Sequence, residues 1–112
     1  MDRFEELADG FKALADPTRL KIVALLNIRD CCICELVPLF GISQPAVSRH
    51  MSRLKQAGLV TETRRGQWVF YSLNRARLAD FTLGVGALPD LSADLQKLES
   101  QGLLVQCTIK TS

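Results

Sequence analysis

The hydrophobic pattern of this chain changes at Gly58, and this change constrains the fold more than any other feature. Before Gly58, apolar residues recur at three- and four-residue spacings, which predicts amphipathic helices. After it, segments 59–64 and 68–73 are rich in β-branched and aromatic residues and flank a tight Arg65-Gly66-Gln67 turn. That arrangement is typical of a β-hairpin. The sequence therefore predicts a mainly α fold with one hairpin, in which Trp68, Phe70 and Tyr71 form the hairpin core.

Capping residues divide the segment before Gly58 into four predicted helices. Asp16 followed by Pro17 is typical of an N-cap with proline at the first helical position, and Ser43 is a second N-cap. The predicted helices cover residues 4–15, 16–27, 32–40 and 43–57. In the second helix we expect the inward face to consist of Leu20, Val23 and Ala24.

Two further helices are predicted after the hairpin. Asn74 is a suitable cap for a helix carrying Leu78 and Phe81, and glycines and a proline then interrupt the pattern. A last amphipathic helix carries Leu91, Leu95 and Leu98.

Length and composition favour a single cytoplasmic domain. The 112 residues are enough for one domain with one core, and no apolar run approaches the ~18 residues of a membrane span. The acidic, amphipathic N-terminus lacks the apolar stretch of a signal peptide, so we expect a cytoplasmic location. Four cysteines in that compartment should be mainly reduced, which favours metal-binding or redox-active thiols over disulfides.

A local basic region points to nucleic acid. The formal net charge is only +2, but basic residues gather between Ser43 and Gln67. Helices 32–40 and 43–57, joined by a turn at Gly41, form a candidate helix-turn-helix, with hairpin 59–73 as its wing. The second of these helices would bury Val47, Met51 and Leu54 and offer its other face to a major groove. The predicted DNA-binding residues are Gln44, Ser48, Arg49, His50, Ser52, Arg53, Arg64 and Arg65.

Three segments resemble one family of repressors. ALADPTR at 13–19, SQPAVSRH at 43–50 and GQWVFY at 66–71 are similar to the ArsR/SmtB family of metal-sensing regulators, and the likeness runs over residues 4–75. The resemblance implies a winged helix-turn-helix homodimer that binds double-stranded operator DNA and represses its own operon. It also implies that the end helices, about 2–15 and 75–101, form the dimer interface, and both carry broad apolar stripes.

Three thiols in four residues form the most informative chemical motif. Cys31, Cys32 and Cys34 can supply soft ligands to arsenite, antimonite, cadmium or another thiophilic ion. Their position at a helix start should favour thiolates. On an intact helix Cys31 and Cys34 would share a face, whereas Cys32 and Cys34 would point to nearly opposite sides. One ion held by all three would therefore unwind the first turn and strain the DNA-reading unit.

The resemblance leaves the third ligand open. Arsenic sensors of the family carry Cys-x-Cys-x-x-Cys in this helix, and Cys32 and Cys34 match its first two positions. The third position is Val37, so Cys31 is the preferred third thiolate and Cys107 the second choice. Three thiolates suit arsenite or antimonite, whereas zinc prefers four ligands. The Asp and His ligands of the family's zinc sensors have no counterpart, because His50 is the only histidine.

Two other functions are compatible with this sequence. The same thiols can serve a redox switch by forming a sulfenic acid or a disulfide, although a vicinal Cys31–Cys32 bridge would be strained. The cysteines can also be buried hydrophobes in a constitutive DNA-binding module. An enzyme is disfavoured, since the sequence has no histidine beside a nucleophile, no paired carboxylates and no phosphate-binding glycine loop. The sequence predicts no permanent cofactor and leaves the operator and the physiological inducer open.

Overall fold

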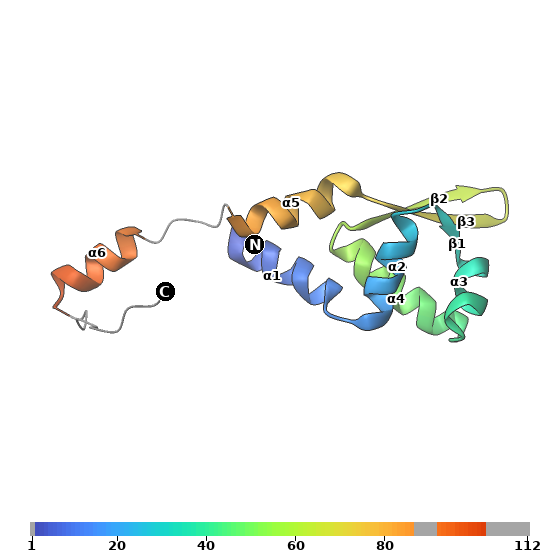
Figure 1. Cartoon of the computed structure of the whole chain (residues 1–112), viewed down its shortest axis with the longest axis horizontal. Helices are drawn as coiled ribbons and strands as arrows, with labels where there is room; N and C mark the ends of the chain where they lie inside the picture. Colours follow the sequence, from blue (N-terminus) through green and yellow to red (C-terminus); the bar gives the residue numbers. More distant parts are fainter. Residues whose placement is uncertain (1, 87–91, 103–112) are drawn as a thin grey trace.

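Helices surround a small antiparallel sheet in the computed structural model, which describes residues 2–86 and 92–102 (Figure 1). No helix in these ranges is long and apolar enough to span a membrane. The elements are, in chain order, α1 (Arg3–Leu14), α2 (Pro17–Leu26), β1 (Cys31–Cys32), α3 (Ile33–Phe40), α4 (Gln44–Gln56), β2 (Val60–Arg65), β3 (Trp68–Leu73), α5 (Arg75–Gly86) and α6 (Ser92–Ser100).

The predicted caps begin the helices as expected. The side chain of Asp16 accepts a hydrogen bond from the Arg19 amide at 3.0 Å, and Pro17 holds the first position of α2. Ser43 accepts from the Ala46 amide at 3.2 Å and begins α4. Gly41 ends α3 with a φ of 64°, a left-handed conformation that glycine adopts without a Cβ clash. A sharp turn between α3 and α4 follows from these two local features.

The predicted inward face of α2 is largely wrong. Val23 is buried as expected, but Leu20 is 52% exposed and Ala24 is exposed as well. The buried side consists instead of Ile22, Val23 and Leu26. Apolar residues lie on every side of this helix, so the spacing of its residues does not select one face.

The sheet contains one strand that the sequence pattern missed. Strands β2 and β3 form the predicted hairpin, turning at Gly66, and we call this hairpin the wing. Strand β1 adds to the other edge of β3, so the order is β1-β3-β2. Cys31 pairs with Tyr71 and Cys32 with Phe70. The helix expected from residue 32 therefore begins one residue later, and Cys31 and Cys32 precede it as a strand.

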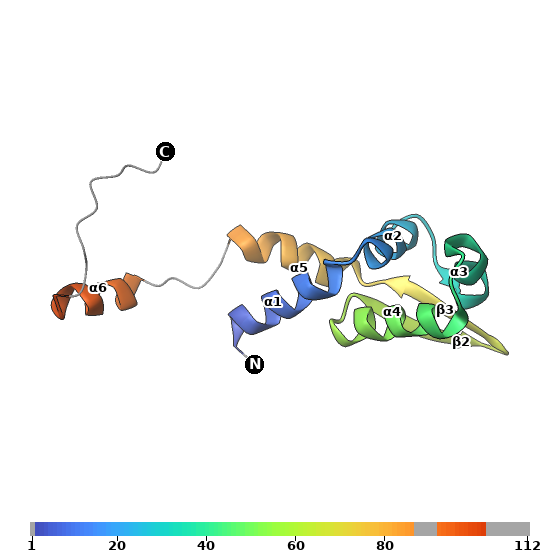
Figure 2. The same ribbon diagram turned by 90° about the horizontal axis from the view of Figure 1, so that it is seen from below.

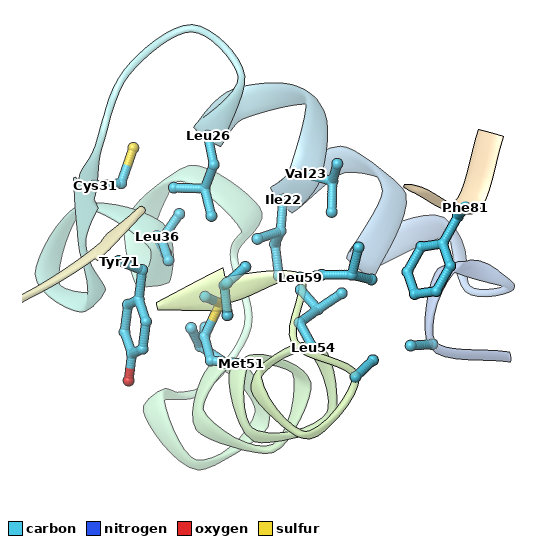
Figure 3. Packing of buried hydrophobic residues seen from close by; sticks show 14 of the residues in the cluster. Ile22, Val23, Leu26, Cys31, Leu36, Met51, Leu54, Leu59, Tyr71 and Phe81 are labelled. Carbon is cyan, nitrogen blue, oxygen red and sulfur yellow. The ribbon is translucent and has the colours of Figure 1, made fainter. Parts of the chain in front are cut away.

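The core lies where α2, α3 and α4 meet the sheet (Figure 3). Helix α4 buries Val47, Met51 and Leu54, as its spacing predicts. Strands β2 and β3 contribute Val60 and Tyr71. Together these contacts hold α4 and the wing in a fixed relation, because each packs on the same apolar cluster.

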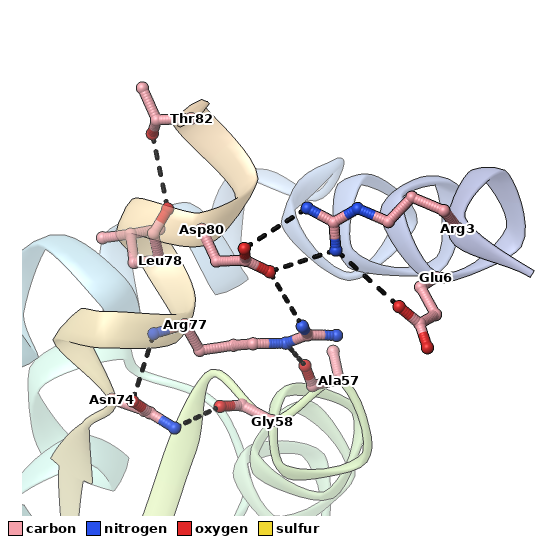
Figure 4. Close-up of polar contacts among 9 residues, drawn as sticks. All are labelled: Arg3, Glu6, Ala57, Gly58, Asn74, Arg77, Leu78, Asp80 and Thr82. Atoms are coloured by element: carbon pink, nitrogen blue, oxygen red, sulfur yellow. Dashed lines mark hydrogen bonds and ion pairs between the residues drawn. The ribbon is translucent and has the colours of Figure 1, made fainter. Parts of the chain in front are cut away.

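Helices α1 and α5 lie side by side, on the side of the helix-turn-helix away from the wing tip (Figure 2). Phe81 of α5 is 1% exposed and lies directly over Gly10 of α1. Asp80 accepts hydrogen bonds from Arg3 of α1 at 3.3 Å and from Arg77 at 3.1 Å (Figure 4). An apolar contact and a charged contact thus join the two helices.

The last predicted helix is present as α6, which Figure 1 shows apart from the other helices. Leu98 on this helix is 39% exposed. Leu91, the side chain of Leu95 and the candidate ligand Cys107 lie outside the described residues.

Candidate functional site

Helices α3 and α4 form a helix-turn-helix whose second helix has one buried and one exposed face. The exposed face carries Gln44, Arg49 and Ser52, and Ser48 is half-buried beside them. Among the described residues, Arg49 makes no hydrogen bond or ion pair within the chain. Its guanidinium group is therefore available to a partner that carries phosphates or guanine edges.

Two of the predicted DNA-binding residues on α4 contact other helices instead. Arg53 pairs with Asp9 of α1, with Nη2 3.0 Å from Oδ1 and 3.3 Å from the Asp9 carbonyl oxygen. The His50 side chain points from α4 toward the start of α2. Its Nδ1 lies 3.9 Å from the Asp16 carboxylate and 3.3 Å from Arg19 Nη1. These side chains fix the position of α4 against α1 and α2.

The wing carries two exposed arginines near its turn. Arg64 and Arg65 are exposed, and the Arg65 guanidinium lies 5.3 Å from the centre of the Phe70 ring. Lys55 of α4 is held by Glu62 of β2 at 2.7 Å, and this hydrogen bond lowers the pKa of Glu62. Among the described residues, three basic side chains between positions 43 and 67 form no ion pair with an acidic side chain. They are Arg49, Arg64 and Arg65.

Of the three aromatic residues predicted to form the hairpin core, one is buried. Tyr71 is 8% exposed and Phe70 is half-buried, but Trp68 is 49% exposed. Trp68 lies at the start of β3, next to the turn, and borders a cavity described below. The prediction of a core position is therefore wrong for Trp68, because the tip of the wing extends past the helices.

The three clustered thiols lie in three different environments. Cys31 is 2% exposed and belongs to the core cluster (Figure 3), with Sγ 3.6 Å from the Arg29 carbonyl oxygen. Cys32 is also buried, but it caps α3 and accepts a hydrogen bond from the Cys34 amide at 3.4 Å. Cys34 is exposed in the first turn of α3.

The structure corrects the predicted geometry of the cluster. Cys31 and Cys34 do not share a helix face, because Cys31 belongs to strand β1 and only Cys34 belongs to helix α3. Cys32 and Cys34 are not on opposite sides either, because both border the same cavity and the Cys34 amide donates a hydrogen bond to the Cys32 sulfur. The two can therefore meet one bound atom without unwinding of the first helical turn.

The expected shift toward thiolate is also wrong for Cys31 and Cys34. Hydrogen bonding to the Cys32 thiol raises the pKa of Cys34, and burial of this pair adds to the effect. Burial in the core raises the pKa of Cys31, and the nearby Glu35 carboxylate acts in the same direction. These effects outweigh the helix N-terminus, so both thiols stay protonated at neutral pH more fully than an ordinary cysteine.

Glu35 is a residue of this site that the sequence analysis did not single out. Its carboxylate accepts a hydrogen bond from the Cys32 amide at 2.9 Å. The same carboxylate forms an ion pair with Arg29 at 3.1 Å. With Cys32 as N-cap and Glu35 three residues later, the pair forms a capping box. The spacing Cys32-x-x-Glu35 is the signal that identifies it, although cysteine is an unusual cap.

A cavity of ≈ 490 Å³ lies between Cys32, Cys34 and both predicted DNA-reading elements. Its lining comes from the start of α3, the first residue of α4 and the tip of the wing. The lining residues are Cys32, Ile33, Cys34, Val37, Gln44, Arg64, Gln67, Trp68 and Val69. Cys31 is not among them, and within residues 2–86 and 92–102 no three Cys, His, Asp or Glu side chains are arranged to hold a metal ion.

The chain is similar to known transcription regulators. A model of the arsR family of bacterial regulatory proteins matches residues 16–62. Transcriptional repressor SdpR of Bacillus subtilis (strain 168) is 44% identical over 70 residues, covering 62% of this chain and 78% of the repressor. The arsenical resistance operon repressor of Escherichia coli (strain K12) is 45% identical over 65 residues, covering 57% of this chain and 56% of the repressor. The chain thus matches little more than half the length of the second relative.

A solved structure shares the fold. An ArsR-like transcriptional regulator from Rhodococcus sp. RHA1 matches with a TM-score of 0.70 and 26% identity, over 88% of this chain and 90% of that one. This match confirms the predicted winged helix. The similar proteins are regulators of transcription and not enzymes, in agreement with the sequence analysis.

Proposed function

This chain belongs to the arsR family of bacterial regulatory proteins, and on that premise we propose that it is a homodimeric repressor released from operator DNA by a thiophilic ion at Cys32 and Cys34. Arsenite and antimonite are the preferred inducers, with cadmium or another soft ion as further candidates. The E. coli relative, an arsenical resistance operon repressor, supports this choice. The protein would act in the cytoplasm, where its operator lies.

The cavity beside the thiol pair is the observation that carries this proposal. Cys32 and Cys34 face a space whose other walls include Gln44 of α4 and Arg64 of the wing. An occupant of that space contacts both elements that would touch DNA. Because α4 and the wing pack on one core, a shift of either changes the surface presented to the groove. Coupling of about 1–3 kcal/mol is typical of such linked sites.

The proposed DNA surface combines α4 with the wing. Gln44, Ser48, Arg49 and Ser52 would enter the major groove, and Arg64 and Arg65 would contact phosphates beside it. His50 and Arg53, which bind Asp16, Arg19 and Asp9, would hold α4 at the angle that DNA requires.

The proposed dimer uses α1 together with the segment 75–101. Helices α1 and α5 already pack against each other, and Phe4 and Phe11 of α1 are each 41% exposed. A second copy that covers these side chains would remove apolar surface from water. A two-fold dimer also matches the symmetry of a palindromic operator.

The third ligand to an arsenite or antimonite ion remains a proposal of its own. Cys31 is the preferred donor, with Cys107 as the second choice. Cys31 would reach the ion only if β1 left β3 and its thiol left the core, since Cys31 now pairs with Tyr71 and is buried. That movement would disturb the strand that also forms the wing, and it supplies a second route from ion binding to loss of DNA affinity.

A redox-switched repressor is the second candidate, and the position of Cys32 and Cys34 on one cavity, with the Cys34 amide hydrogen-bonded to the Cys32 sulfur, favours it as a disulfide pair. The raised pKa of Cys34 does not separate the two functions, because the thiolate is both the form that oxidants attack and the form that binds soft ions. Mass spectrometry of protein released from DNA separates the two. A redox switch requires oxidised cysteines in the released form, whereas a metalloid sensor releases with reduced, ligand-bearing sulfurs.

A parallel titration tests the proposal. Reduced protein bound to labelled DNA from upstream of its own gene is titrated with arsenite, antimonite, cadmium and zinc, and release is followed by fluorescence anisotropy. We expect the trivalent ions to release the wild type and to fail with Cys34→Ser and with Cys32→Ser, which keeps an oxygen acceptor at the N-cap. Release of both variants at wild-type concentrations would refute the proposed site.

A further inference from the structure

Two side chains at the start of α5 bind backbone carbonyls at the C-terminal end of α4 (Figure 4). Asn74, which directly precedes α5, donates from its side-chain amide to the Gly58 carbonyl oxygen at 3.0 Å. Nε of Arg77 donates to the Ala57 carbonyl oxygen at 3.3 Å. The last carbonyls of a helix have no partner within that helix, so a donor from another element can hold them. The C-terminal end of α4 is therefore anchored to α5.

Arg77 also connects this anchor to α1. Its Nη1 lies 3.1 Å from the Asp80 carboxylate, which accepts two further hydrogen bonds from Arg3 of α1, each at 3.3 Å. The same guanidinium lies 4.6 Å from the centre of the buried Phe81 ring. Because a guanidinium is planar and rigid, its hydrogen bonds to a carbonyl and a carboxylate have a fixed relative geometry. Helices α4, α5 and α1 are thus joined through one side chain.

The anchored end of α4 is opposite to the end that would enter the major groove. Gln44 begins the helix and Ala57 follows it, and the 13 residues of α4 span about 20 Å. A tilt of about 10° at the anchor would therefore move Gln44 by about 3.4 Å, which is the rise of one base pair. Apolar packing is non-directional, whereas hydrogen bonds have preferred angles, so the polar anchor is suited to fixing this tilt.

We propose that Asn74 and Arg77 are positioning residues that fix the angle of α4 relative to α1 and α5, and thereby set the half-site spacing that the dimer accepts. The proposal rests on the homodimeric repressor proposed above. Such a dimer reads two half-sites whose centres are about 34–36 Å apart, or a multiple of that distance. Two copies of α4 held at a fixed angle match one spacing, and they do not have to be ordered when DNA binds.

A series of operators with altered centres tests this role. The operator upstream of the gene is mapped by footprinting, and one or two base pairs are inserted or deleted at its centre. The readout is the Kd for each altered operator divided by the Kd for the native one, measured by fluorescence anisotropy. We expect a ratio of about ten or more for the wild type at a shift of one base pair, and about three or less for Arg77→Ala. Partial unfolding leaves this ratio unchanged, because it weakens binding to every operator alike.

Three further variants separate positioning from general stability. Asn74→Asp keeps an oxygen that can accept from the Arg77 amide but removes the donor to the Gly58 carbonyl, so it should also lower the ratio. Thr82→Ala is the matched control on α5, since its hydroxyl bonds to a carbonyl of its own helix, and it should keep the wild-type ratio. Leu36→Val truncates a fully buried side chain of α3 and should lower stability while leaving the ratio unchanged.

A second measurement does not need DNA. Cys34 is exposed, and a spin label on it in a Cys107→Ser background, with one label per protomer verified by intact mass, reports the distance between the two helix-turn-helix units of the free dimer. We expect the distribution of that distance in pulsed electron paramagnetic resonance to broaden in Arg77→Ala and to remain as in the wild type in Thr82→Ala.

Wild-type spacing ratios in both Arg77→Ala and Asn74→Asp would overturn the inference, as would an equal loss of the ratio in Leu36→Val. These results are separable from failure of the repressor proposal. A wild-type chain that binds DNA as a single protomer contradicts the homodimer and this inference with it. A dimer that shows the predicted spacing effects but is not released by any thiophilic ion contradicts the sensing proposal alone.

Discussion

The Cys32 sulfur stabilises helix α3 and is also a candidate ligand for the bound ion. Its sulfur caps α3 by accepting from the Cys34 amide, and the same sulfur borders the cavity shared with Gln44 and Arg64. Replacing a hydrogen bond at that sulfur by a bond to arsenic removes the cap from the helix that supports α4. Local stability and ligand binding thus involve the same atom.

At the residue scale, the two arginines of α4 have different predicted roles. Arg49 is exposed, so Arg49→Ala should lower operator affinity and reduce the salt dependence of binding by about one counterion, with unfolding unchanged. Arg53 pairs with Asp9, so Arg53→Ala should lower the free energy of unfolding by about 1 kcal/mol. Urea denaturation and a salt series of DNA titrations measure both effects. Equal effects of the two substitutions on unfolding would contradict these roles.

Local sequence signals predict part of the structure of the candidate site. Soft-ligand chemistry is evident from three cysteines in four residues, and the exposed face of α4 follows from its spacing. The separation of Cys31 from Cys32 and Cys34 depends on a two-residue strand, which is too short to produce a periodic pattern. Pairing of Arg53 with Asp9 joins residues 44 positions apart, and no local pattern encodes it.

At the element scale, Gly10 allows α1 and α5 to approach closely. A Cβ at this position would lie 2.2 Å from Cζ of Phe81, whose ring is buried. Gly10→Ala should therefore lower the free energy of unfolding by about 1–2 kcal/mol, since so close a contact places the steric cost at about 2–3 kcal/mol, the upper part of the usual range, against a helix-propensity gain near 1 kcal/mol. Chemical denaturation measures the change.

A double-mutant cycle supplies the control for this contact. Adding Phe81→Leu should make Gly10→Ala much less costly, because the smaller side chain leaves room for the new methyl group. If Gly10→Ala is neutral or stabilising in the wild-type background, the close packing of α1 on α5 is contradicted.

The ion pairs of Asp80 predict a pH dependence of the same helix contact. The hydrogen bond from Arg3, with a smaller effect from Arg77, lowers the pKa of Asp80. A folded-state pKa below the unfolded value of about 3.9 stabilises the protein above that value, and the effect is lost as pH falls through the lower folded pKa. Asp80→Asn should therefore lower the melting temperature at pH 7, and its difference from wild type should shrink below about pH 4. A difference that is constant down to pH 2 would exclude this role of the carboxylate.

Element boundaries were predictable where capping chemistry marks them. Asp16, Ser43 and Gly58 each mark a boundary that the structure confirms within about a residue. The face of α2 was not predictable, because Leu20 and Ile22 are equally apolar and only packing against the sheet distinguishes them.

At the scale of the whole molecule, the account requires two copies of the chain. Phe4 is 41% exposed on α1, and covering the exposed part of this side chain in both copies contributes about 1–2.5 kcal/mol. Phe4→Asp should weaken self-association by roughly 10- to 100-fold or more and lower operator affinity with it. Leu39→Asp on α3, exposed but distant from α1, is the control. Sedimentation equilibrium checks this, and a wild-type chain that is monomeric at micromolar concentration would contradict it.

The operator affinity of empty and ligand-loaded protein, measured at one salt concentration, tests the central claim most directly. The account predicts that loading Cys32 and Cys34 with arsenite, verified by intact mass, raises the operator Kd by about 5- to 150-fold. Cys34→Ser should show no such rise at the same reagent concentration. A loaded wild-type protein that holds the operator as tightly as the empty one would contradict the claim that the cavity controls the DNA-reading surface.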